Sequence, residues 1–195
     1  MVTLNDSMDS AARAGRATES MGLDGIKLHI GGREKRDGWA ILDATPGPGV
    51  DYVGNCTDLS FLPAASCVEV YASHVLEHLG YDRELPNTLA GIHRVLKPGG
   101  RLCVSVPDLE ILCRLFLEPS LNGDGRFRIM QLMFGERKNA YDVNCAGFNF
   151  EFLHAFLHET GFRDIRRVTE FGLFDDASTL VFANVPISLN VEARR

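Results

Sequence analysis

EVYASHVLEHL (Glu69–Leu79) and HRVLKPGGRLCVSVPD (His93–Asp108) are the two stretches that decide the fold. The first begins as an apolar strand that ends in small and polar residues, and the second carries a Pro-Gly-Gly turn into another apolar strand. With a helix between them, these strands form a βαβ unit. Because open α/β sheets bind ligands outside the carboxyl ends of their strands, Ala72, Ser73 and His74 are candidate site residues.

Further strands are predicted on both sides of this unit. They cover residues 26–30, 39–44, 51–55, 162–171 and 187–193, and helices are predicted from near Pro86, after the N-cap Asp108, and over 126–134 and 150–160. Strands joined by crossovers indicate an α/β fold with a doubly wound, Rossmann-like, mostly parallel sheet. We expect helices on both faces of that sheet.

One domain accounts for most of the chain. Residues 1–24 mix Ser, Ala, Gly, Asp and Arg without a steady period, so we expect a mobile N-terminal leader. Residues 25–195 form the domain. Within it, residues 109–149 follow the fifth strand with two helices and an irregular stretch, so we expect an insertion over the binding edge.

The composition limits the classes of function. The chain has 195 residues, a net charge of −6 and 45% hydrophobic residues, as is ordinary for one globular domain. Its Lys and Arg residues are scattered, so we expect no nucleic-acid partner. Five cysteines without a CxxC pair favour the cytoplasm, and no stretch reaches the roughly 20 apolar residues of a membrane span.

Two glycines and one aspartate follow the first two strands. Gly31 and Gly32 would let backbone N–H groups approach a ligand closely, or they form an ordinary turn. Asp43 can accept hydrogen bonds from the hydroxyls of a ribose, or it is a solvated loop residue. No GxGxxG motif is present, so a nicotinamide or flavin dinucleotide is disfavoured.

Four segments together resemble the class I S-adenosylmethionine-dependent methyltransferases, in particular the small bacterial type 11-like family. Two of these segments are the ones quoted above. The other two are KLHIGGREKRDGWAILDA (27–44) and DYVGNCTDLSFLP (51–63). The resemblance implies a seven-stranded sheet with an antiparallel last strand, methyltransferase activity and S-adenosylmethionine as cofactor. It further implies these cofactor-binding residues: Ile30, Gly31, Gly32, Asp43, Ala44, Asn55, Cys56, Asp58, Leu59, Ala72, Ser73 and His74.

Methyl transfer from a sulfonium is an in-line displacement, and an oxygen acceptor needs a base to remove its proton. His74 and Asp108, which follow the fourth and fifth strands, are the candidate bases. The insertion supplies aromatic and polar residues for a small polar acceptor, which we expect to be a sugar or a cell-surface glycan precursor. Those residues are Tyr141, Asn144, Phe148 and Asn149.

Two other functions stay open at this point. His74, Glu77 and His78 spell HxxEH, the inverted motif of zinc hydrolases, but a zinc site needs a third protein ligand and a longer helix than Gly80 allows. We expect no metal site, and His78 is expected to have a structural hydrogen bond. A non-catalytic binding or scaffold protein on the same fold is the other alternative.

Overall fold

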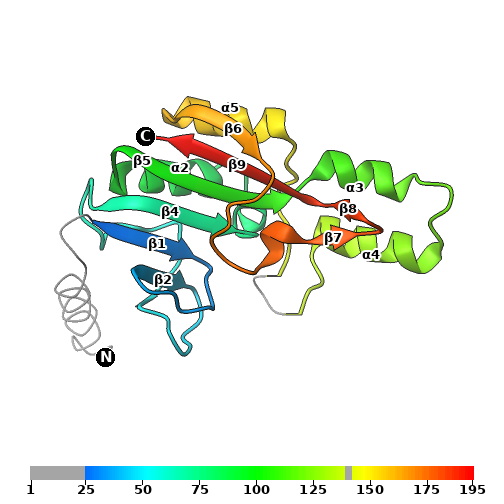
Figure 1. Ribbon diagram of the computed structural model, residues 1–195, viewed down its shortest axis with the longest axis horizontal. Coiled ribbons are helices and arrows are strands. Elements are labelled where there is room, and N and C mark those ends of the chain that lie inside the picture. The colour runs from blue at the N-terminus through cyan, green and yellow to red at the C-terminus, as the bar shows by residue number, and fades with distance from the viewer. Residues whose placement is uncertain (1–24, 139–141) are drawn as a thin grey trace.

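A seven-stranded sheet organises the computed structural model, which describes residues 25–138 and 142–195. The strand order is β3-β2-β1-β4-β5-β9-β6, and Figure 1 shows the strands side by side. Strands β1 to β5 pair in parallel, whereas β9 pairs antiparallel with β5 and with β6. The predicted seven-stranded, mostly parallel sheet with an antiparallel last strand is confirmed.

The strands lie close to their predicted positions. Their bounds are β1 Ile26–Ile30, β2 Trp39–Asp43, β3 Tyr52–Val53, β4 Cys67–Ser73, β5 Leu96–Pro107, β6 Arg163–Val168 and β9 Ser188–Arg194. A separate two-stranded hairpin contains β7 Val181–Phe182 and β8 Val185–Pro186. The strand β5 starts before the predicted Pro-Gly-Gly turn, and its pairing with β4 shifts register there.

The helices begin and end at residues whose side chains or backbone suit those positions. Helix α3 (Leu109–Phe116) starts at Asp108, whose carboxylate accepts N–H bonds from Glu110 and Ile111. Helix α5 (Phe150–Thr160) ends at Gly161 with a left-handed φ of 108°. The remaining helices are α2 (Glu84–Val95), α4 (Gly123–Phe134) and the 3-10 helices η1 (Leu76–His78) and η2 (Ala177–Thr179).

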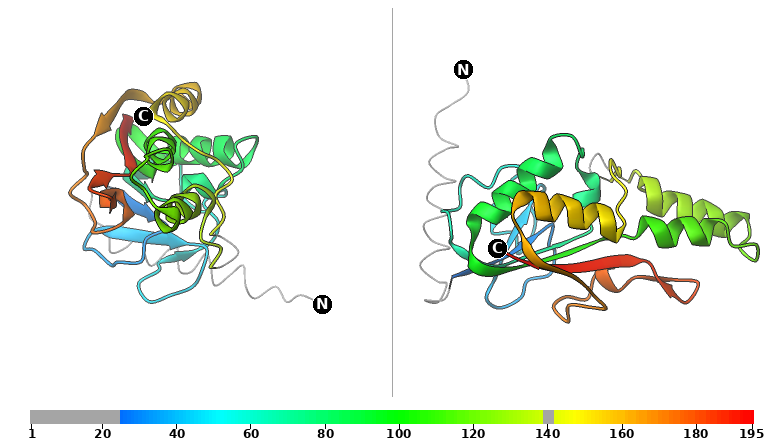
Figure 2. Two further views of the ribbon diagram at one scale, coloured as in Figure 1. Left: turned by 90° about the vertical axis from the view of Figure 1, so that its right-hand side faces the viewer. Right: turned by 90° about the horizontal axis from the view of Figure 1, so that it is seen from above.

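The two faces of the sheet are covered differently. Helices α2 and α5 pack on one face, where Val70, Leu102 and Val191 belong to the main core (Figure 2). On the opposite face, Tyr71 and Trp39 pack under the segment 171–174. Of the described helices, only the 3-10 turn η2 lies on that face, against β5 and β9. Within the described residues, the helices α2 and α5 thus cover one face and the short 3-10 helix η2 lies on the other.

An arm projects beyond the carboxyl edge of the parallel strands. It consists of α3, α4 and the β7–β8 hairpin, which lie together at the right of Figure 1. A small core of Leu112, Ile129 and Ile187 holds them together. The arm contains most of the predicted insertion 109–149, and the expected leader 1–24 lies outside the described residues.

Candidate functional site

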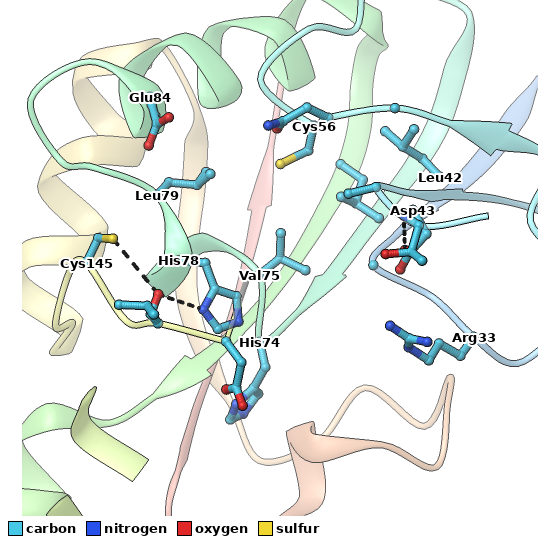
Figure 3. Close-up of a pocket in the computed structure, with 18 residues that line it drawn as sticks. Arg33, Leu42, Asp43, Cys56, His74, Val75, His78, Leu79, Glu84 and Cys145 are labelled. Atoms are coloured by element: carbon cyan, nitrogen blue, oxygen red, sulfur yellow. Dashed lines mark hydrogen bonds between the residues drawn. The ribbon is translucent and has the colours of Figure 1, made fainter. Parts of the chain in front are cut away.

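A cavity of about 500 Å³ opens at the carboxyl ends of β1, β2 and β4. This is the volume of a typical site for a small molecule. Asp43 and Arg33 lie on one side of it and His78 and Cys145 on the other (Figure 3). We call the two sides the strand end, with Ile30, Gly31, Arg33, Asp43, Ala44 and Asn55, and the histidine end, with His74, His78, Glu84, Asp142, Val143 and Cys145.

The strand end is built by the loops that follow β1 and β2. Asp43 accepts the N–H of Thr45 on Oδ1 at 2.7 Å, and its Oδ2 has no partner among the described residues. Gly31 has a φ of +74°, and a Cβ there would lie 2.6 Å from Cγ2 of Val75. The backbone of Gly31, which has no side chain, and the Asp43 carboxylate, with one oxygen unpartnered among the described residues, therefore face the cavity at this end.

The loop after β3 adds an amide and a thiol. Asn55 accepts the N–H of Thr57 on Oδ1 at 3.0 Å, which leaves its Nδ2 hydrogens free of partners among the described residues. Burial raises the pKa of the Cys56 thiol to about 11. Because a thiol is a nucleophile only as its thiolate, Cys56 is an apolar wall of the cavity.

His74 has a polar neighbour at each ring nitrogen. Its Nε2 lies 3.0 Å from Oγ of Ser188, and its Nδ1 lies 3.3 Å from Oε1 of Glu77. Burial lowers the pKa of His74 to about 4 and raises that of the fully buried Glu77 to about 8, so both side chains are neutral near pH 7. His74 also has a φ of +52°, a rare backbone conformation for a residue with a Cβ.

His78 has a different environment. Its Nδ1 lies 3.1 Å from the backbone carbonyl of Val143. Because a carbonyl only accepts, Nδ1 carries the hydrogen, and the neutral ring keeps its lone pair on Nε2. Nε2 has no hydrogen-bond partner among the residues that the structure describes, and Figure 3 shows it on the side of the ring away from Val143.

The backbone of Glu77 holds the far wall of the cavity in place. Its carbonyl accepts the N–H groups of Cys145 at 2.7 Å and of Ala146 at 3.0 Å. Cys145 lies 68 residues after Glu77 in the chain, so these bonds bring the end of the insertion against η1. The histidine end therefore depends on contacts between distant segments.

The HxxEH hypothesis fails on geometry. The helix η1 spans three residues, and Nε2 of His74 is bonded to Ser188. Among the described residues, no group of three side chains is arranged to hold a metal ion. The sequence HxxEH therefore does not form a zinc site within residues 25–138 and 142–195.

Seven of the predicted cofactor residues line the cavity, and five do not. The seven are Ile30, Gly31, Asp43, Ala44, Asn55, Cys56 and His74. Of the other five, Gly32 packs under His29, whose ring a Cβ would meet at 2.5 Å. Asp58 is exposed and accepts the N–H of Ser60. Leu59 and Ala72 belong to the buried core, and Ser73 lies beside the cavity without lining it.

The second candidate base, Asp108, does not line the cavity. It is 1% exposed, it caps α3, and its Oδ2 lies 3.4 Å from a nitrogen of Arg167. Its place in the fold is therefore structural. An aspartate after a strand is typical both of a helix N-cap and of a binding site, and the sequence alone does not distinguish these two roles.

The predicted acceptor residues of the insertion also lie elsewhere. Asn144 donates to the carbonyl of Leu132, Asn149 caps α5, and Phe148 is buried in the core. Tyr141 is outside the described residues. The insertion instead contributes Asp142, Val143 and Cys145, and the sequence also missed Arg33, His78 and Glu84 as cavity residues.

Residues 32–104 match a family described as "Methyltransferase domain". The fold is similar to that of a SAM-dependent methyltransferase from Archaeoglobus fulgidus, with 16% identity, a TM-score of 0.55, and 95% of this chain and 92% of that chain covered. A second similar structure is an S-adenosylmethionine-dependent methyltransferase from Mesorhizobium loti, with 19% identity, a TM-score of 0.52, and 96% and 100% covered.

A third similar structure is a 1,6-didemethyltoxoflavin-N1-methyltransferase from Burkholderia thailandensis, solved with 1,6-didemethyltoxoflavin and S-adenosylhomocysteine. It is 19% identical, with a TM-score of 0.53, and 97% of this chain and 81% of that chain are covered. The curated proteins gave no match. No helix within the described residues is long and apolar enough to cross a membrane.

The matched segment contains β2, β3, β4 and most of the loops that form the cavity. Residues 32–104 therefore match a methyltransferase domain, and the described chain has the fold of S-adenosylmethionine-dependent methyltransferases. The predicted resemblance is confirmed at the level of the matched domain and the fold.

Proposed function

We propose that this methyltransferase domain binds S-adenosylmethionine at the strand end of its cavity and transfers the methyl group to a small polar acceptor at the histidine end. The observation that carries the proposal is the unshared Oδ2 of Asp43, at the carboxyl end of β2 and beside the bare backbone of Gly31. Carboxylates at this place in α/β sheets accept the hydroxyls of a ribose.

The residues present fit the cofactor. Asp43 offers an acceptor for ribose hydroxyls, and the Nδ2 group of Asn55 offers a donor for a ring nitrogen of adenine. The exposed guanidinium of Arg33 offers a positive charge for the carboxylate of the methionine part. When bound, S-adenosylmethionine supplies an electrophilic methyl group on a sulfonium, and the protein aligns an acceptor with it.

A sugar or a precursor of a cell-surface glycan is the acceptor class that we propose. The histidine end carries polar groups from three segments, with His78, Glu84 and Asp142 along its wall. Such groups suit a small hydroxylated acceptor better than an apolar one. All five cysteines are free, which supports our further proposal of a reducing, cytoplasmic location.

Calorimetric titration with S-adenosylhomocysteine tests the cofactor site. We expect binding by the wild-type protein and at least a tenfold loss of affinity in Asp43→Ala, since a hydrogen bond to a charged group contributes about 1.5–3 kcal/mol. Asp58→Ala is the matched control, because Asp58 is exposed and outside the cavity. Absence of binding by the wild type would overturn the proposal and favour a non-catalytic role for the fold.

A further inference from the structure

His74 and His78 lie four residues apart at the same end of the cavity, but their hydrogen bonds require opposite tautomers. The hydroxyl of Ser188 donates to the carbonyl of Ala177 at 2.7 Å, so its oxygen is an acceptor toward Nε2 of His74 at 3.0 Å. Nε2 of His74 must therefore carry a hydrogen. In His78, the bond to the carbonyl of Val143 puts the hydrogen on Nδ1.

The remaining nitrogen of His74 is not available to a ligand. Its Nδ1 faces Oε1 of Glu77 at 3.3 Å, and the Glu77 side chain is 3% exposed. Burial raises the pKa of Glu77 to about 8, so the carboxyl beside that nitrogen is protonated near neutral pH. Burial also lowers the pKa of His74 to about 4, so this ring does not take up a second proton near pH 7.

His78 has the unprotonated, unpartnered ring nitrogen that His74 lacks. Its Nε2 lone pair has no partner among the described residues, and its ring lines the cavity. The Nδ1–H bond to Val143 fixes the ring orientation and stabilises the imidazolium after Nε2 takes up a proton, as a carbonyl or carboxylate behind a catalytic histidine does.

We propose that Nε2 of His78 is the general base that removes the proton of the methyl acceptor, and that His74 and Glu77 are positioning residues. The inference rests on the proposed methyl transfer. The lone pair of the acceptor oxygen forms the new bond to the methyl carbon, the carbon–sulfur bond breaks with its electron pair on sulfur, and the hydroxyl proton passes to His78. The products are the methyl ether, S-adenosylhomocysteine and a protonated His78.

Buried neutral side chains and charged cavity residues surround His78. Burial of His74 and Glu77 keeps both neutral near pH 7, so neither adds a charge beside the ring. The titratable and charged groups that line the cavity with His78 are Arg33, Asp43, Cys56, His74, Glu84, Asp142 and Cys145.

The first test reads the tautomers directly and needs neither cofactor nor acceptor. Long-range ¹H–¹⁵N NMR of the full chain near pH 7.5 distinguishes a hydrogen on Nδ1 from one on Nε2, and His74→Gln and His78→Gln assign the signals. We expect the Nδ1–H form for His78 and the Nε2–H form for His74. An Nε2–H form for His78 would overturn the proposal, since its lone pair would then point at Val143.

The second test measures the accessibility of the lone pair. Diethyl pyrocarbonate modifies an unprotonated imidazole nitrogen, and peptide mass spectrometry locates the product. We expect His78 to react faster than His74 and to be protected by S-adenosylhomocysteine. His158 on α5 is the internal reference, because it is exposed, outside the cavity and not expected to be protected. Reaction of His74 with an unreactive His78 would reject the proposal.

Turnover gives the size of the effect. With any acceptor that the wild type methylates, we expect His78→Gln to lower kcat by about 10²-fold or more, with S-adenosylhomocysteine affinity within about threefold of wild type. His158→Gln should retain wild-type turnover. Retained cofactor binding separates this proposal from the proposed function: a His78→Gln variant that binds and methylates normally removes His78 as the base, while the cofactor site stands.

Discussion

The strand end and the histidine end of the cavity are built in different ways. At the strand end, Gly31 follows β1 directly, Asp43 is the last residue of β2, and Asn55 lies two residues after β3; these strands pair in parallel. At the histidine end, Val143 and Cys145 come from the insertion and are held by bonds to His78 and to the carbonyl of Glu77. The residues of the strand end are positioned by the sheet, whereas those of the histidine end are positioned by a few contacts between distant segments.

The difference shows which parts of a site tolerate change. At the strand end, Ile30 and Asp43 pair within the sheet and Gly31 donates its N–H to the carbonyl of Leu42, so a change at these residues should alter both folding and ligand binding. The wall at Val143–Ala146 depends on three hydrogen bonds to η1, so a change there should alter the acceptor side alone. The following substitutions test this contrast, in order of expected effect.

Gly31→Ala should have the largest effect. The left-handed φ of +74° costs an alanine about 1 kcal/mol or more, and its Cβ would meet the stiff, β-branched Val75 at 2.6 Å. We expect the free energy of unfolding to fall by about 2–4 kcal/mol and the affinity for S-adenosylhomocysteine to fall at least tenfold. Urea denaturation and calorimetry measure the two quantities.

Gly99→Ala is the matched control for this substitution. Gly99 has nearly the same φ of +76°, but no atom lies within 4 Å of the position of its Cβ. Its variant should show the backbone strain of about 1 kcal/mol without the steric contact and without loss of ligand affinity. Equal losses of stability in the two variants would show that the close approach of Val75 adds nothing to the loss of stability in Gly31→Ala.

The same contrast explains what the sequence predicted. The β-branched runs and the turns predicted the strands, and the carboxyl ends of parallel strands predicted Gly31, Asp43 and His74 at one edge. The wall at Val143 was not predicted, because it depends on a hydrogen bond between the His78 ring and the Val143 carbonyl, 65 residues apart, that no local pattern encodes. Asp108 and Asp58 do not line the cavity, and caps and turns use the same residue types as binding sites.

Glu77→Gln should remove a pH dependence of stability. The pKa of Glu77 is raised from 4.5 to about 8 in the folded protein, so between these values the folded state holds a proton that the unfolded state has released. The free energy of unfolding therefore falls as the pH rises, by about 1.5 kcal/mol from this group between pH 6.5 and 8. The amide of the variant keeps a donor toward His74 and does not titrate.

The measurement is urea denaturation of wild type and Glu77→Gln from pH 5 to 8.5. The stability difference should grow in favour of the variant over this range, which only a raised pKa produces. Glu159→Gln is the control, since Glu159 is exposed on α5. If the difference in the free energy of unfolding between Glu77→Gln and wild type stayed constant with pH, Glu77 would be ionised throughout this range. A charged His74 beside it would then be required.

Ala146→Pro should loosen the histidine end alone. Proline lacks the N–H that Ala146 donates to the carbonyl of Glu77 at 3.0 Å, which removes a bond that contributes about 1 kcal/mol. We expect His78 to lose its protection from solvent, seen as faster reaction with diethyl pyrocarbonate, while S-adenosylhomocysteine affinity changes less than threefold. Cys145→Ala keeps both backbone bonds and is the control. An equal loss of cofactor affinity would contradict the independence of the two ends.

Arg33→Ala should have the smallest effect, although it lies at the strand end. Its guanidinium is exposed, and a pair between exposed charges contributes about 0.2–1 kcal/mol, because water screens it. We therefore expect the affinity for S-adenosylhomocysteine to fall by about fivefold or less, and the salt dependence of binding to become weaker than in the wild type. Calorimetry at two ionic strengths measures both. A loss above tenfold would mean that the Arg33 loop closes over the ligand and desolvates the pair, so that the strand end, too, would depend on a segment that strand pairing does not hold.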